Sequence, residues 1–327
     1  MVTSRQFTRG VVRTMRAMDR AAKQAERQRI ARQQALHRQA QLDASAQAAA
    51  EYDAIMDALT GAHRIQFRRR DWLTVATEPT TPDPERTAHE QAAAEAELDN
   101  YAPGWFARTF GREAHQRQAL ADRVDAARAR DDESHLRRKQ AVSARNAEIE
   151  FARRVVAREP DALAQALEDH SGIGSLPFSV EGANLVFRDD RIIAVVDGLD
   201  LDDMPEESVS LLKSGKASVK TIPVGKRLEV HRDALCSAAV RVGLECLATL
   251  PIDEVELVML TDVLDRGTGH ITAAPALHLR LTAQAVAALN LTRTDAAELV
   301  DRLGAHIDWN RRDGFRPINA AAFGIDL

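Results

Sequence analysis

The chain has 327 residues, enough for two or three domains, and a formal net charge of -5. Aromatic residues make up only 4% of it, which argues against one compact core and for a globular part joined to an extended part. No stretch approaches the roughly 18 apolar residues of a membrane span, and the N-terminus lacks the apolar core of a secretory signal. We therefore expect a cytoplasmic protein without membrane contact.

Charge is unevenly distributed along the sequence. Residues 1–40 contain ten Lys or Arg against Asp19 and Glu26, a net charge of +8, which leaves -13 for the rest of the chain. A basic end of this kind favours contact with phosphates or with an acidic partner. Cys236 and Cys246 form no CxxC motif and lie too far apart to cross-link within one helix, which suggests a reducing compartment.

One long helix is predicted from Arg5 to about Leu59. This stretch has no proline and one early glycine. Its apolar stripe is interrupted by polar residues between Gln28 and Arg38, so the pattern departs from a strict heptad. Its first apolar residues recur at intervals of three or four: Phe7, Val11, Met15, Met18, Ala22 and Ala25.

An irregular tip is expected over about residues 61–111. Gly61 ends the helix, and the prolines of residues 77–84 keep the linker out of helix. The aromatic residues of 101–111 are expected to form a hydrophobic plug that closes a helical hairpin, in preference to a ligand platform.

A second long, highly charged helix is predicted from Arg112 to Arg158. Two helices of similar length joined by a broken connection favour an antiparallel coiled-coil hairpin. Residues 1–158 would then form a helical arm through which the chain makes a homo-oligomer.

The remaining residues, 159–327, are predicted to form a globular domain. It begins with a short helix that carries Pro160 in its first turn and ends at residues 171–174. Alternating apolar runs predict three strands, and a helix follows them: Phe178–Phe187, Arg191–Val196, Ala217–Pro223 and Arg227–Thr249.

A β-hairpin over Pro251–Thr282 is the clearest pattern in the sequence, and we expect it at the centre of the sheet. The glycines of residues 265–269 supply its turn. Its apolar residues alternate with period two: Val255, Leu257, Met259, Leu277, Leu279 and Leu281. Short helices opened by Thr282 and by Thr294–Asp295 follow, and then a tail, Trp309–Pro317. The predicted fold class is α+β, with a mostly antiparallel sheet carried on the helical arm.

No active site is evident in the sequence. The acidic residues between Asp189 and Glu207 fit no EF-hand spacing, and His270 and His278 have no further Cys or His nearby, so we expect a solvated edge and no metal. A restriction-type nuclease needs an acid or Gln two residues before a Lys, and no Glu or Gln in this chain stands in that position. We therefore predict no catalytic residue and no cofactor.

Basic residues remain as candidates for contact with nucleic acid or a partner, with a solvated charged face as the plain alternative. They are Arg5, Arg9, Arg13, Arg16, Arg68, Arg69, Arg70, Lys213, Lys216 and Lys220.

Several motifs, in their order, resemble a known family. They are residues 104–111 (Gly-Trp-Phe to Phe-Gly), the strand pair after residues 171–174, the helix over residues 233–242, residues 265–270 and residues 277–279. Together they are similar to the region that precedes the catalytic domain in some long bacterial restriction endonucleases of the Mrr-like type. The resemblance covers most of the chain and is strongest from about Phe178 to Pro317. In those enzymes a PD-(D/E)xK nuclease domain follows, whereas this chain stops at Leu327.

The resemblance implies a non-catalytic sensor, targeting or assembly module of a DNA-restriction or antiphage system, which binds DNA or a separately encoded effector. A coiled-coil scaffold that self-associates without nucleic acid is the alternative. An enzyme of another type, assembled from distant loops, is the third hypothesis.

Overall fold

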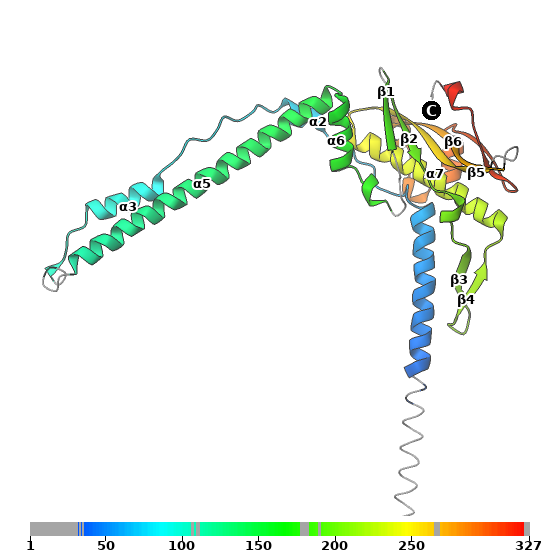
Figure 1. Ribbon diagram of the computed structural model, residues 1–327, viewed down its shortest axis with the longest axis horizontal. Helices are drawn as coiled ribbons and strands as arrows, with labels where there is room; N and C mark the ends of the chain where they lie inside the picture. Colours follow the sequence, from blue (N-terminus) through cyan, green and yellow to red (C-terminus); the bar gives the residue numbers. More distant parts are fainter. Residues whose placement is uncertain are drawn as a thin grey trace, which may run out of the picture. The chain divides into compact units, whose positions relative to one another are not determined.

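The computed structural model describes residues 32, 34, 36–105, 108, 112–176, 183–188, 191–264 and 269–323. The chain divides into two compact units (Figure 1). The first unit comprises Met1–Phe67, Gly172–Cys246 and Asp253–Leu327, and the second comprises Arg68–Ser171 and Leu247–Ile252. This division differs from the expected boundary after residue 158, because helical residues 36–60 belong to the first unit and the short helix after Pro160 belongs to the second.

The first unit is built on a six-stranded mixed sheet, in the order β1-β2-β5-β6-β7-β8. Its strands are β1 (Ala183–Arg188), β2 (Arg191–Asp197), β5 (Glu254–Leu264), β6 (Ile271–Thr282), β7 (His306–Asn310) and β8 (Gly314–Arg316). All neighbouring pairs are antiparallel except β2 and β5, which are parallel. The predicted α+β class and mostly antiparallel sheet are confirmed.

The β5–β6 hairpin lies at the centre of this sheet, as the alternation predicted. Val255 pairs with Leu281 and Leu257 with Leu279, and all four side chains are buried. The turn residues 265–268 lie outside the described chain. Helix α7 (Val224–Thr249) packs on the face that carries these leucines: a Cβ on Gly243 would lie within 2.9 Å of Leu257 and Leu281 side-chain atoms. Glycine thus permits the close approach of helix and sheet.

A smaller apolar cluster covers the opposite face of the sheet. Ile193, Val195 and Val258 pack there against Ala320 and Phe323, which belong to the 3-10 turn η4 (Ala320–Phe323). The central strands are therefore buried on both faces.

Helix α7 connects the β3–β4 segment to β5 and supplies the crossover that a parallel β2–β5 pair requires.

Three strands were missing from the sequence prediction. β3 (Glu207–Leu211) pairs with β4 (Ala217–Thr221) in a separate two-stranded sheet, where only β4 was expected. β7 and β8 occupy a region predicted as helix end and tail. The reason is length: strands of three to five residues carry little periodic signal of their own, and their pairing partners stabilise them. The two short helices near the end are confirmed as α8 (Ala283–Ala287), capped by Thr282, and α9 (Ala296–Arg302), capped by Asp295.

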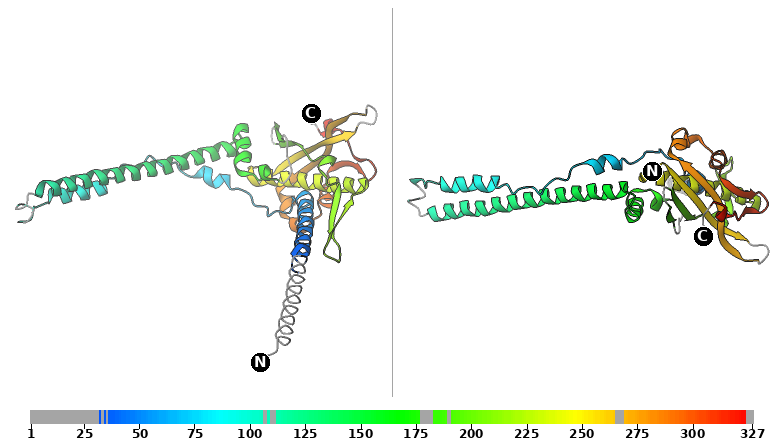
Figure 2. Two further views of the ribbon diagram at one scale, coloured as in Figure 1. Left: turned by 60° about the horizontal axis from the view of Figure 1, so that its bottom comes forward. Right: turned by 90° about the horizontal axis from the view of Figure 1, so that it is seen from above.

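The second unit is helical. It contains α2 (Trp72–Thr77), α3 (His89–Asp99), α5 (Glu113–Val156) and α6 (Pro160–His170). Figure 2 shows α3 running beside α5, and α2 also packs on α5. In its described residues, the segment expected to be irregular therefore contains the helices α2 and α3. One of them, α3, consists mostly of the strong helix formers Ala, Glu and Gln.

The expected pairing of the two long helices in a coiled-coil hairpin is not confirmed. Within its unit α5 packs on α2 and α3, whereas helical residues 36–60 belong to the first unit. At the predicted aromatic tip, Trp105 is 70% exposed, which does not fit a hydrophobic plug, and residues 106 and 110 lie outside the described chain. Among the described helices, none has the length and apolar content needed to cross a membrane.

Candidate nucleic-acid or partner interface

The predicted basic residues fall into three groups. Arg5, Arg9, Arg13 and Arg16 lie outside the described residues. Arg68–Arg70 open the second unit, where Arg69 donates from Nη2 to the carbonyl oxygen of Ile252 at 2.7 Å and the Arg70 guanidinium lies 4.5 Å above the Trp72 ring. These two contacts lie within the second unit, and all three arginines are exposed.

The structure brings Lys213, Lys216 and Lys220 together on the β3–β4 hairpin, where all three are exposed. The chain contains only six lysines, and four of them lie between residues 213 and 226, so this concentration is a property of the hairpin and the adjoining start of α7. Most other basic residues of the chain are arginines, and the majority of those on α5 pair with acids of their own unit.

The two faces of this hairpin differ in chemistry. Residues opposite each other in an antiparallel pair share a face, and the register places Ser208 opposite Lys220 and Ser210 opposite Ser218. The hydrogen bond from Leu212 N to Lys216 O, 2.9 Å long, continues the ladder and puts Lys216 on the same face. We call these five polar residues, Ser208, Ser210, Lys216, Ser218 and Lys220, the lysine-serine face; Leu212, which lies opposite Lys216, is an exposed apolar residue on the same face.

Most residues on the other face of the hairpin are apolar, and Glu207 and Thr221, which lie opposite each other at its end, are polar. Val209 is opposite Val219, and Leu211 is opposite Ala217; Val219 and Leu211 are 55% and 50% exposed. At the turn, Gly215 has a φ of +78°, which favours glycine, and a Cβ there would lie 3.0 Å from Leu42. The turn therefore lies against the helix of residues 36–60.

Sequence reasoning found the three lysines but missed the serines. The signal was present: Ser208, Val209, Ser210 and Leu211 alternate polar and apolar, as the residues of β4 do. The short run and the acidic, proline-containing stretch before it hid the strand.

A second polar site of the first unit surrounds buried His231. Its Nε2 donates to the carbonyl oxygen of Leu199 at 2.7 Å, and Thr261 Oγ1 donates to Asp200 Oδ1 at 2.8 Å. Asp200 Oδ1 also accepts a hydrogen bond from the backbone N–H of Asp262 at 2.6 Å. Burial, and then the nearby charges of Asp200 and Asp202, raise the pKa of the Asp262 carboxyl.

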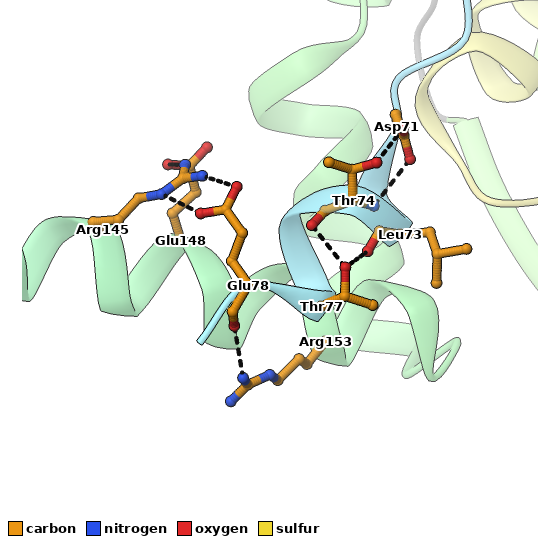
Figure 3. Close-up of polar contacts among 8 residues, drawn as sticks. All are labelled: Asp71, Leu73, Thr74, Thr77, Glu78, Arg145, Glu148 and Arg153. Carbon is orange, nitrogen blue, oxygen red and sulfur yellow. Dashed lines mark hydrogen bonds and ion pairs between the residues drawn. The ribbon is translucent and has the colours of Figure 1, made fainter. Parts of the chain in front are cut away.

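Figure 3 shows two sets of polar contacts in the second unit: those that join Glu78, the residue after α2, to α5, and those within α2 and its N-terminal cap. Arg145 donates to both carboxylate oxygens of Glu78, at 3.1 and 2.5 Å, and to Glu148 at 2.6 Å; these hydrogen bonds, first to Glu78 and then to Glu148, raise the pKa of Arg145. Arg153 donates to the carbonyl oxygen of Glu78 at 3.1 Å. Asp71 caps α2 through Thr74, and these bonds lower the pKa of Asp71. Each charged group here has a partner within the unit, so the cluster is structural.

The described residues contain no group of three or more His, Cys, Asp or Glu side chains that is placed to hold a metal ion. Cys236 and Cys246 are free and buried, and burial raises the pKa of each thiol to about 12. A thiol with such a pKa stays protonated near pH 7, so neither cysteine is an activated nucleophile.

Three buried histidines of the first unit predict acid sensitivity. Burial lowers the pKa of His63, His231 and His278, so the folded state favours the neutral rings. In His63, Nε2 donates to Thr294 O at 3.1 Å and Nδ1 lies 3.0 Å from Ser237 Oγ, which suits the neutral ring. Because the pKa of each ring in the folded state lies below the ordinary value of about 6.5, the neutral rings contribute their full stabilisation above about pH 6.5. This contribution to the free energy of unfolding is lost as the pH falls below that value.

We expect the free energy of unfolding, measured with urea, to fall between pH 7.5 and 5.5. In His63→Gln the fall should be smaller, because one of the three buried rings no longer titrates. The control is His115→Gln, on the exposed surface of α5, which should leave the pH dependence as in the parent chain. Equal stability of the parent chain at both pH values would contradict the prediction.

Comparisons with protein-family models, with curated proteins and with solved structures gave no match to this chain.

Proposed function

We propose that the chain is a non-catalytic DNA-binding module and that the lysine-serine face of the β3–β4 hairpin contacts the phosphate backbone. The observation that carries the proposal is this face itself: Lys216 and Lys220 share it with Ser210 and Ser218, and with Ser208, whose hydroxyl donates to the carbonyl oxygen of Lys220 at 3.2 Å. Ammonium and hydroxyl groups are the donors that proteins direct at phosphate oxygens. Within β3 and β4 the acidic residue, Glu207, is on the opposite face, and Glu206, which precedes β3 on the side of the lysine-serine face, pairs with Arg227 at 3.5 Å.

The shape of the hairpin supports the same reading. The major groove of DNA admits a two-stranded β-ribbon, and several DNA-binding proteins use one. β3–β4 forms a sheet of two strands, separate from the six-stranded sheet (Figure 1). Lys213, in the turn, would place a third cation at the end of such a ribbon.

A pair of matched double variants tests this function. In Lys216→Gln/Lys220→Gln, duplex DNA should bind more weakly, and the slope of log affinity against log salt should fall by about 0.9 for each phosphate that is no longer neutralised. The control, Lys139→Gln/Lys226→Gln, removes the same charge from lysines that pair with Asp83 and Glu229, and should bind as the parent chain does. Equal weakening in both variants, or no mobility shift of duplex DNA at low salt, would rule the ribbon contact out.

The basic N-terminal residues form a second candidate DNA contact. Replacing Arg5, Arg9, Arg13 and Arg16 by Gln should weaken the salt-sensitive shift further, in addition to the effect of the lysine variant. If this quadruple variant binds DNA as the parent chain does, these arginines have another partner.

The sequence resemblance adds a biological setting to the proposal: a sensor, targeting or assembly subunit of a restriction or antiphage system, cytoplasmic, working with a separately encoded effector. The free cysteines agree with a reducing compartment. The proposal includes homo-oligomerisation of the chain through its N-terminal helical residues, which would pair with those of another copy.

A self-associating scaffold without nucleic acid is the second candidate, and exposed apolar residues of the N-terminal helix favour it. On this helix Leu36 and Ile55 are 71% and 51% exposed, and self-association through the helix would bury them. Light scattering of the full chain, with and without duplex DNA, separates the two functions. A stable oligomer that does not bind DNA supports the scaffold.

A further inference from the structure

The first unit contains a cavity of about 290 Å³ beside the start of α7. Its walls come from four places in the fold: the 3-10 turn η2 (Leu201–Asp203), the first two turns of α7, the ends of β5 and β6 next to their shared turn, and the β7–β8 turn. The lysine-serine face contributes nothing to its lining, so this site is distinct from the proposed DNA contact.

The floor of the cavity is apolar, and so is much of its rim. Leu228 and Phe315 are buried in the lining. At the opening, Val224 and Ile271 are each 64% exposed and Leu264 is 54% exposed. Single exposed apolar side chains are ordinary, but three around one opening mark a binding surface.

Negative charge accompanies this apolar surface. Asp202 and Asp262 line the cavity with exposed carboxylates, and neither forms an ion pair within the described chain. The other two lining carboxylates are occupied: Asp200 accepts backbone and hydroxyl hydrogen bonds, and Asp313 pairs with Arg316 at 2.9 Å. Among the described residues of the lining, Arg312 is the one cation, and its single charge faces four carboxylates. A cation that entered between Asp202 and Asp262 would therefore be stabilised.

We propose that this cavity binds the basic N-terminal segment of the chain, residues 1–31, with an arginine side chain between Asp202 and Asp262 and an apolar side chain on the surface of Val224, Leu264 and Ile271. The segment complements the cavity in both respects. It carries eight Lys or Arg against two acids, and its apolar residues Phe7, Val11, Met15 and Met18 recur three or four positions apart.

The volume of the cavity is suitable for binding one or two side chains of a polypeptide segment. Its volume lies near the lower limit of ligand pockets, about 300 Å³, which suits one or two side chains of a segment that lies across the opening. When the segment comes from a second copy, the contact joins two different surfaces, and such a heterologous contact builds rings or filaments.

Photo-cross-linking in the full chain tests the occupant. With p-benzoyl-phenylalanine in place of Ile271, at the rim, irradiation should yield a cross-linked peptide from residues 1–31, identified by mass spectrometry. The same probe in place of Leu73, an exposed residue of α2 in the second unit, should not yield that peptide. Cross-links from position 271 that map only to other segments or other proteins would overturn the proposal.

Charge and apolar variants sharpen the test. Asp202→Asn/Asp262→Asn should lower the cross-linking yield by roughly tenfold at low salt, the effect of losing two exposed ion pairs near the upper end of their range. The control, Asp122→Asn/Asp125→Asn on the exposed side of α5, should leave the yield unchanged. Replacing Phe7, Val11, Met15 and Met18 by Ser should also lower the cross-linking yield. An unchanged yield in that variant, or in the Asp202/Asp262 variant, would overturn the proposal.

A cross-linked band at twice the chain mass assigns the segment to a second copy, and a band at the single mass assigns it to the same chain; both agree with the proposed occupant.

Discussion

Replacing Trp72 by alanine is expected to lower the free energy of unfolding of the second unit by about 3–5 kcal/mol. Trp72 is 2% exposed, and its ring packs edge-on against Phe151 of α5 and tilted against His170 of α6, with centroids 5.7 and 5.4 Å apart. Its Nε1 donates to the carbonyl oxygen of Thr249 within the same unit. Alanine would leave a cavity and an unpaired carbonyl group.

Hydrogen exchange followed by mass spectrometry is the suitable measurement, because it reports each unit separately. Peptides of α5 and α6 near Trp72 should exchange faster in Trp72→Ala, while peptides of β5 and β6 keep the parent rate. The control is Leu73→Ala, the next residue of the same helix, which is 62% exposed and should change little. Equal exchange in the two variants would show that Trp72 does not hold this unit together.

The second large effect is expected in the first unit, where Leu257→Ala should cost about 2–5 kcal/mol. Leu257 lies in the middle of β5, is fully buried, and is paired with Leu279 across the hairpin. It also packs where Gly243 lets α7 approach, so the side chains around it have little freedom to fill the vacated space.

Urea unfolding monitored by circular dichroism and by exchange of the β5–β6 peptides measures this loss. Leu264→Ala is the matched control on the same strand: the same atoms are removed, but Leu264 is exposed, and the change should stay within about 0.5 kcal/mol. A similar loss in both variants would mean that the centre of the sheet is not the core of the unit.

The two proposed binding surfaces of the first unit have opposite chemistry. The lysine-serine face offers cations and hydroxyl groups, whereas the cavity offers carboxylates beside apolar side chains. DNA and the cavity would then bind the same N-terminal arginines, so added duplex DNA should lower the yield of the cross-link from position 271. Such competition would couple DNA binding to assembly.

The elements with strong local periodicity could be predicted from the sequence. Val255, Leu257 and Met259 alternate over a strand of eleven residues, and α7 extends over 26 residues, so each carries enough apolar spacing to define its type. Thr282 and Asp295 marked the starts of α8 and α9 because their side chains cap the first turn of each helix. The cluster of Lys213, Lys216 and Lys220 was also visible as a candidate contact.

Only the tertiary structure decided which segments meet. The parallel β2–β5 pair, the short strands β7 and β8, and the packing of α2 and α3 on α5 depend on contacts between residues far apart in the chain. The same holds for the serines that join Lys216 and Lys220, and for the cavity that brings Asp202 and Asp262 beside Ile271. Local spacing determines what a long segment becomes, because its own residues repeat. Short strands and binding surfaces are decided by the free energy of non-local pairing and burial, which no local pattern records.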